Sequence, residues 1–234
     1  TINNFKTMKK LAVKYLLEFL VIVIGISLSF YVEEIGKQKD KEEFKNQSLN
    51  RILQNLEGDI RDNKWNLKTV SKSIESGEWI YKNRNKLKKH SRDSIGFHLA
   101  RANNFLTVFV DNQEEYTTLK SSGYLELIEN ESIVKSLQNK YSNHAWMKEV
   151  ERFIIKKSDI LIDFEFKNSE LNSESLNDLG FLVDKKYIGD LNIPKEIIGR
   201  ITDKKFWQKN HLNSIKNRLR KDSILIEEIT KEIN

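Results

Sequence analysis

A run of apolar residues near the start of the sequence constrains the fold more than any other feature. Residues 19–32 (FLVIVIGISLSFYV) carry no charge, and extending the run back to Tyr15 gives 18 residues in which Glu18 alone is charged. An α-helix of 18 residues is about 27 Å long, close to the roughly 30 Å hydrocarbon core of a bilayer. The sequence therefore predicts a membrane-spanning helix over residues 11–32.

A buried helix of a soluble protein and a cleaved signal peptide are the two alternatives to a span. Lysines precede the apolar run and a dense mixture of charges, residues 33–43, follows it, which disfavours a buried helix. No cleavage site built from small residues follows the run, which disfavours a signal peptide. We therefore expect residues 1–10 as a tail, residues 33–48 as a charged helical stalk and residues 49–234 as a separate bundle.

The lysines around the predicted span indicate its orientation. Four lysines lie upstream and four lie within residues 33–45, so their number alone does not decide. The upstream lysines are not interleaved with acids, and a ten-residue tail contains no domain to translocate, which favours a cytoplasmic N-terminus. We expect a single-pass inner-membrane protein with a periplasmic bundle. Glu18 is either neutralised by Lys14, four residues earlier, or in contact with a partner.

The composition predicts an all-α fold. One proline and nine glycines in 234 residues are too few for the turns that a β-sandwich or barrel needs. The absence of cysteine excludes a disulfide scaffold, a thiolate zinc site and a cysteine nucleophile. The net charge of +6 divides into +3 for the first 32 residues and +3 for the other 202. The bulk of the chain is nearly neutral, so we expect no nucleic-acid partner.

Apolar residues recur at helical spacing in three long segments, 49–90, 130–166 and 203–233, and predict an antiparallel helical bundle. Asp203 is the expected N-cap of the last helix. Leucines and isoleucines at heptad spacing form a packing seam along that helix, which Asp222 interrupts once. The four tryptophans are expected to pack between helices.

Shorter elements are expected between the long helices. Ser91 or Asp93 is the predicted cap of a short helix, and a second short helix is expected to end at Gly123 in a left-handed conformation. Residues 105–111 are either a short strand or an irregular segment buried beneath the helices, and the segment 167–194 reads as a loose connection rich in polar residues.

Three blocks of the sequence resemble an uncharacterised family of Bacteroidota single-span membrane proteins. They are the opening KYLLEFLVIVIG, the central block LKSSGYLELI and the charged C-terminal helix, and they occur in that family's order. The resemblance implies one span followed by a helical extracytoplasmic domain, and it implies no activity.

No catalytic or metal-binding motif is present. None of the four histidines has an acid three residues before it, and the sequence lacks a His-Glu-x-x-His, a P-loop, a Gly-x-Ser-x-Gly elbow and a Gly-rich dinucleotide turn. We therefore expect a protein that is not an enzyme and that needs no cofactor.

Two basic stretches without acids, 82–92 and 204–221, are either solvated helix faces or contacts for lipid or an acidic partner. The expected partner or lipid contacts are Glu18, Lys82, Arg84, Lys88, Lys89, Arg218 and Arg220. Beyond lipid contact through residues 11–32, we expect a membrane-protein partner or self-association. The leading hypothesis is a structural or accessory subunit of an envelope complex, acting through helix contacts. The alternative is an extracytoplasmic ligand sensor or binding module.

Overall fold

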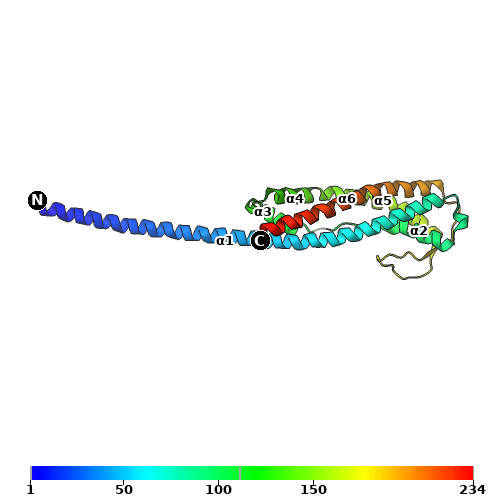
Figure 1. The fold of residues 1–234 in the computed structure, drawn as a ribbon, viewed down its shortest axis with the longest axis horizontal. Helices are drawn as coiled ribbons and strands as arrows, with labels where there is room; N and C mark the ends of the chain where they lie inside the picture. Colours follow the sequence, from blue (N-terminus) through cyan, green and yellow to red (C-terminus); the bar gives the residue numbers. More distant parts are fainter. Residues whose placement is uncertain (1, 111, 234) are drawn as a thin grey trace.

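The computed structural model describes residues 2–110 and 112–233, so residues 1, 111 and 234 of the predicted tail and bundle lie outside it. The all-α prediction is confirmed: helices make up most of the described chain, and strands very little of it. The first helix, α1 (Ile2–Asn83), contains 82 residues. Its N-terminal half projects alone, and its C-terminal half is part of a bundle (Figure 1).

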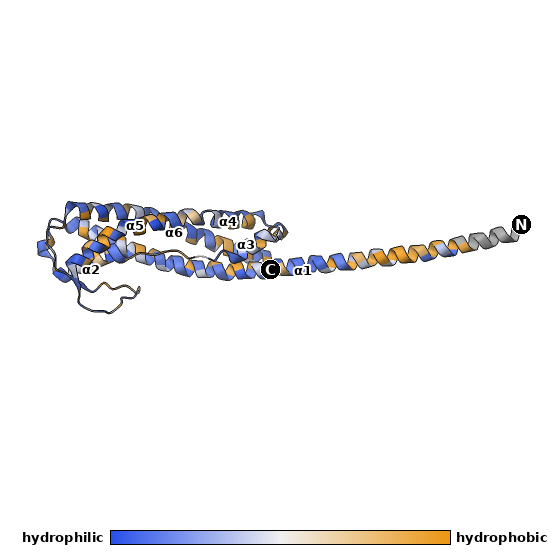
Figure 2. Ribbon diagram, turned by 180° about the vertical axis from the view of Figure 1, so that it is seen from behind, coloured by the Kyte–Doolittle hydropathy of each residue, from blue (hydrophilic) through white to orange (hydrophobic). Residues whose placement is uncertain are grey.

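Helix α1 is continuous because its sequence contains no proline, and its four glycines each cost only about 1 kcal/mol relative to alanine. The apolar run lies in the projecting half (Figure 2). None of its most apolar 18-residue window is buried, and α1 is the only helix in the described ranges long and apolar enough to cross a membrane. The protein therefore exposes a helix of span length that nothing in the described part of the chain covers.

Three helices complete the bundle: α4 (Glu131–Ser142), α5 (His144–Asn168) and α6 (Lys195–Ile233). Helix α6 runs antiparallel to α1, whereas α4 and α5 follow each other in the direction of α1 (Figure 1). The core near the projecting helix contains Leu49, Ile52, Leu137 and Ile229. Burial on α1 begins before residue 49, because Lys45 and Ser48 are already buried. The exposed part of the stalk is therefore shorter than the predicted range 33–48.

The shorter elements close the far end and one side of the bundle. Helix η1 (Leu87–Lys89) follows α1. Of the two predicted caps of α2 (Arg92–Asn104), Ser91 is the one observed, and its hydroxyl accepts the N–H of Ser94 at 3.1 Å. Helix α3 (Glu114–Ser121) is followed by Gly123 at φ 76°, as predicted, and by η2 (Tyr124–Leu127). Residues 105–110 form no strand, and they bury two phenylalanines beneath the helices.

Three predicted helix boundaries are wrong. Helix α1 ends at Asn83 rather than at residue 90. The segment 130–166 is not one helix but two, because α4 ends and α5 begins at Asn143. The last helix begins at Lys195 rather than at Asp203. Proline suits a helix start because the first N–H groups of a helix have no partner within it, and proline has no N–H. The carbonyl of Pro194 accepts the N–H of Ile198 at 3.2 Å. Asp203 lies within α6 and accepts a hydrogen bond from Lys157 at 2.5 Å.

A small antiparallel hairpin was not predicted. Strand β1 (Ser169–Leu171) pairs with β2 (Lys185–Tyr187), and Ser169 faces Tyr187 in the register. Strand β2 packs against α2 at Gly96, and Tyr187 is buried in the core beneath it. The hairpin therefore covers the end of the bundle that lies farthest from the projecting helix.

Candidate functional site

Three helices bring a cluster of charged side chains together in the bundle interior. Lys140 of α4 places its Nζ 2.8 Å from a carboxylate oxygen of Asp59 on α1 and 3.0 Å from both carboxylate oxygens of Asp222 on α6. Each side chain is at most 6% exposed. We call Asp59, Lys140 and Asp222 the ion cluster. Asp222, which interrupts the predicted apolar seam, is therefore a buried ion-pair partner.

One turn before Asp222, a second buried cation lies on α6. Arg218 is 9% exposed, and its guanidinium carbon lies 4.3 Å from the centroid of the Phe109 ring. Its Nη1 is buried and has no hydrogen-bond acceptor among the described residues. The expectation that Arg218 is part of an exposed basic surface is wrong, whereas Arg220, two residues on, is exposed.

A buried carboxyl group and a buried imidazole lie next to Arg218. Both carboxyl oxygens of Glu151 lie 3.2 Å from the backbone nitrogen of Phe109, and one is 3.4 Å from Nε2 of His211. Burial raises the pKa of Glu151 to about 7 and lowers the pKa of His211 to about 4. Between these values the contact joins two neutral groups and is not an ion pair.

The replacement Glu151→Gln should make the protein more sensitive to acid. As the pH falls from 6.5 to 4.5, the unfolded chain keeps Glu151 charged and protonates His211. In the folded protein, Glu151 is protonated and His211 stays neutral over the same range. Glu151 then adds stability while His211 removes it, so the two contributions cancel. Without Glu151, the free energy of unfolding should fall more steeply, by about 1.4 kcal/mol per pH unit. Denaturant unfolding across this pH range measures the difference, and parallel wild-type and variant curves would contradict it.

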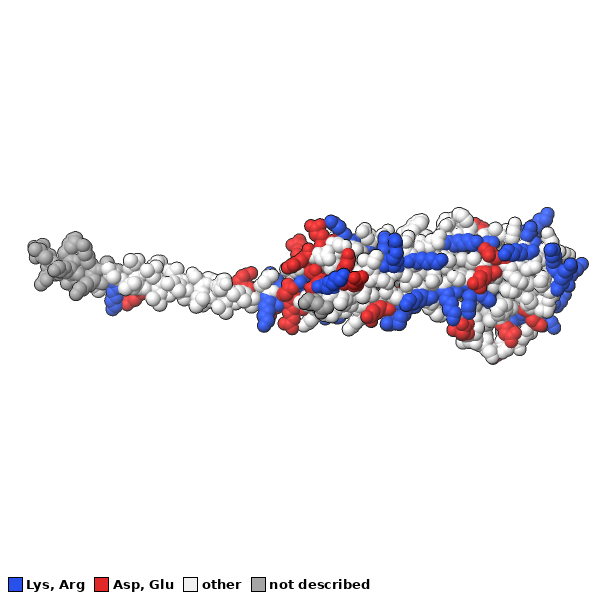
Figure 3. Space-filling view, in the orientation of Figure 1, with Lys and Arg blue, Asp and Glu red and all other residues white. Residues whose placement is uncertain are grey.

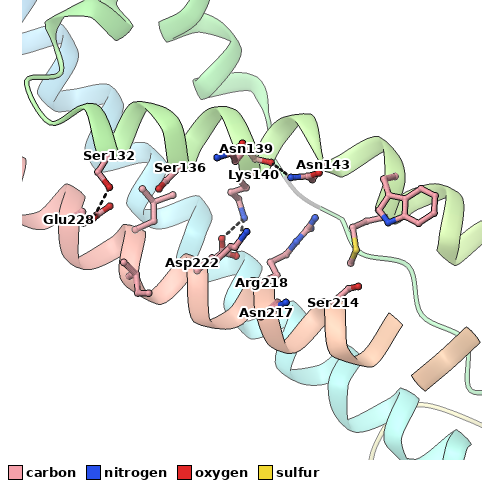
Figure 4. A pocket seen from close by; sticks show the side chains of 15 residues that line it. Ser132, Ser136, Asn139, Lys140, Asn143, Ser214, Asn217, Arg218, Asp222 and Glu228 are labelled. Atoms are coloured by element: carbon pink, nitrogen blue, oxygen red, sulfur yellow. Dashed lines mark hydrogen bonds and ion pairs between the residues drawn. The ribbon is translucent and has the colours of Figure 1, made fainter. Parts of the chain in front are cut away.

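A cavity of about 400 Å³ lies between α4, the start of α5 and α6 (Figure 4). The ion cluster contributes Lys140 and Asp222 to its wall, and Arg218 reaches into it from α6. Met147 and Leu225 add apolar surface. Small uncharged polar side chains line much of the rest: Ser132, Ser136, Asn139, Asn143, Ser214 and Asn217. A cavity of this size, with mixed walls and a few fixed charges, is typical of small-ligand sites.

The tryptophans follow the prediction only in part. Trp79 and Trp207 are half-buried between elements, as expected. Trp146 is 64% exposed and lines the cavity from the start of α5, so the prediction that it packs between helices is wrong.

The first basic stretch lies at the far end of the bundle, where Lys and Arg side chains gather (Figure 3). Lys82, Lys88 and Lys89 are exposed there, and the guanidinium of Arg84 stacks 4.1 Å from the Tyr81 ring. About 75 Å of helix separates Lys82 from the end of the apolar run. These four residues therefore lie far from any bilayer that the apolar run occupies.

The second basic stretch is not a single surface. Lys204 is 1% exposed and donates hydrogen bonds of 2.8 Å to the carbonyls of Ala102 and Asn103 at the end of α2. Burial lowers its pKa to about 7. At the other end of the chain, Glu18 lies 3.8 Å from Lys14, and both side chains are exposed.

The described residues contain no group of three or more His, Asp or Glu side chains that could hold a metal ion. Comparison with protein-family models, with curated proteins and with solved structures finds no match to this chain. The family resemblance in the sequence therefore stays a prediction, and the cavity with its buried charges is the strongest candidate site.

Proposed function

We propose that this chain is a single-pass inner-membrane protein whose periplasmic bundle is a non-catalytic structural or accessory subunit of an envelope complex. The observation that carries the proposal is the continuity of α1: one helix contains the exposed apolar run and also contributes residues to the core of the bundle. The proposal includes the resemblance to the single-span family, which implies the same order of span and helical domain.

The continuity of α1 supports a role in positioning. Between Val32 and Phe44 the chain rises about 18 Å as an unbroken helix, where a flexible linker would let the bundle move freely. The bundle is thereby held at a fixed distance from the apolar run and in a fixed rotation about the helix axis relative to it. Such a geometry suits a protein that presents one surface to a neighbouring membrane protein.

An apolar stripe on α5 supports contact through helices. Trp146, Phe153 and Ile160 recur every seven residues, and they are 64%, 41% and 44% exposed. Residues at this spacing lie on one side of a helix, as in the seams between packed helices. We propose that this stripe contacts the partner.

The double variant Phe153→Ser/Ile160→Ser should abolish co-purification of the partner with the tagged full-length protein in mild detergent. The matched control is Phe166→Ser/Leu176→Ser, which replaces two apolar residues that are 81% and 63% exposed and lie off the stripe. Mass spectrometry of the three preparations identifies proteins that depend on the stripe. A partnerless, monodisperse monomer from the wild type would reject the accessory-subunit proposal.

The proposed orientation has a separate test. Lys39→Cys introduces a single thiol on the exposed part of α1, and the chain contains no other cysteine. This thiol should react with a membrane-impermeant maleimide in spheroplasts whose inner membrane is intact. Labelling that appears only after the inner membrane is broken would invert the topology and place the bundle in the cytoplasm.

The second candidate function is that of an extracytoplasmic binding module. The observation that favours it is the cavity of about 400 Å³ with the buried Arg218 in its wall. The two functions are compatible, because the apolar stripe and the cavity share only Trp146.

A further inference from the structure

The two buried cations beside the cavity differ in how their charge is satisfied. Lys140 contacts two carboxylates, those of Asp59 and Asp222. Arg218 is almost as deeply buried, yet both oxygens of the nearby Asp222 are already directed at Lys140. In the described ranges, no hydrogen-bond acceptor lies within reach of Nη1 of Arg218.

A buried guanidinium nitrogen without an acceptor is costly. Arginine keeps its charge at any physiological pH, so it cannot escape burial by losing a proton. The Phe109 ring and the Glu151 carboxyl group offer Arg218 only partial compensation, because Glu151 is half-protonated near pH 7. Since Arg218 also lines an open cavity, a molecule that enters it can supply an acceptor to the guanidinium.

The other walls of the cavity define the rest of that molecule. Met147 and Leu225 give it an apolar side, and Trp146 adds an exposed aromatic ring. Glu228 lies in the wall ten residues along α6 from Arg218, and its buried Oε2 also lacks a described hydrogen-bond partner. A second acid, Asp222, faces the cavity as well. These two acids disfavour polyanions, so a single negative charge fits best.

We propose that the cavity between α4, α5 and α6 binds a small organic monocarboxylate with an apolar body. The ligand carboxylate accepts hydrogen bonds from the planar fork of Arg218, the geometry in which arginine recognises carboxylates. Its body lies against Met147 and Leu225. The inference rests on the cavity alone, and it stands whether or not the α5 stripe contacts a partner.

Calorimetry with the full-length protein in lipid nanodiscs tests the proposal. The probes are 4-phenylbutyrate, hexanoate and indole-3-acetate, each compared with its neutral amide, together with inorganic phosphate. At least one carboxylate should bind more tightly than its amide and than phosphate. Arg218→Gln should weaken that binding by roughly ten- to hundredfold. Arg220→Gln, which removes an exposed charge from the same helix, should leave it unchanged.

A second measurement needs no ligand. If Arg218 lacks an acceptor in the free protein, Arg218→Met should raise the midpoint of thermal unfolding, because an unmatched buried charge is replaced by an apolar side chain of similar length. A lowered midpoint would overturn the proposal, since Arg218 would then be fully satisfied within the chain. Equal binding of carboxylates and amides, equal binding of phosphate, or binding unaffected by Arg218→Gln would also overturn it. None of these outcomes bears on partner co-purification.

Discussion

The replacement Lys140→Met is expected to lower the free energy of unfolding by about 3–5 kcal/mol. Lys140 is the cation between Asp59 and Asp222, and all three side chains are at most 6% exposed. Without Lys140, two carboxylates stay buried next to each other with no lysine between them. Urea unfolding of the full-length protein in detergent, followed by near-UV circular dichroism, measures the loss. The tyrosines and tryptophans of the bundle provide that signal.

Two control variants separate loss of the charge from loss of packing. Lys135→Met removes an exposed lysine of the same helix, whose partner is Glu131 at 2.8 Å, and should change the free energy by less than about 0.5 kcal/mol. The triple variant Lys140→Met/Asp59→Asn/Asp222→Asn removes the whole ion cluster and should recover much of the loss, because the cluster then contributes no charge that needs a partner. If Lys140→Met were as mild as Lys135→Met, the ion cluster would not be desolvated.

The ion cluster shows where prediction from the sequence ends. The heptad pattern of the last helix identifies Asp222 as an interruption, and this part of the prediction was useful. Its partner Lys140 lies 82 residues away on another helix. The amphipathic pattern of a helix indicates which of its faces points inward. It does not indicate how three such helices are rotated and shifted relative to one another, which decides the side chains that meet. Arg218 and Arg220 carry the same charge two residues apart, so only the packed structure separates the buried one from the exposed one.

Local signals predicted the elements that depend on local physics. The capping hydroxyl of Ser91 and the left-handed Gly123 are fixed by hydrogen bonds and backbone freedom within a few residues. The break at Asn143 was missed because neither proline nor glycine marks it. The hairpin was missed because each strand has only three residues, and its position depends on contact with α2.

That contact leads to the second large effect, at Gly96. Helix propensity alone predicts that Gly96→Ala, inside α2, stabilises the protein by about 1 kcal/mol. Packing predicts the opposite sign. A Cβ at this position would lie 2.1 Å from the carbonyl oxygen of Lys185 and 2.8 Å from the backbone nitrogen of Tyr187. Backbone atoms of a paired strand cannot rotate away, so the hairpin must separate from the helix.

We expect Gly96→Ala to lower the free energy of unfolding by about 3 kcal/mol and to expose residues 172–184 to limited proteolysis. The matched control is Gly199→Ala in α6, where an added Cβ meets no atom within 4 Å. Gly199→Ala should therefore raise the free energy of unfolding by about 0.5–1 kcal/mol. Opposite signs for the same substitution in two helices would show that contact with β2, and not helix propensity, requires glycine at position 96. If both variants were stabilised, the hairpin would not pack against α2 as closely as the structure has it.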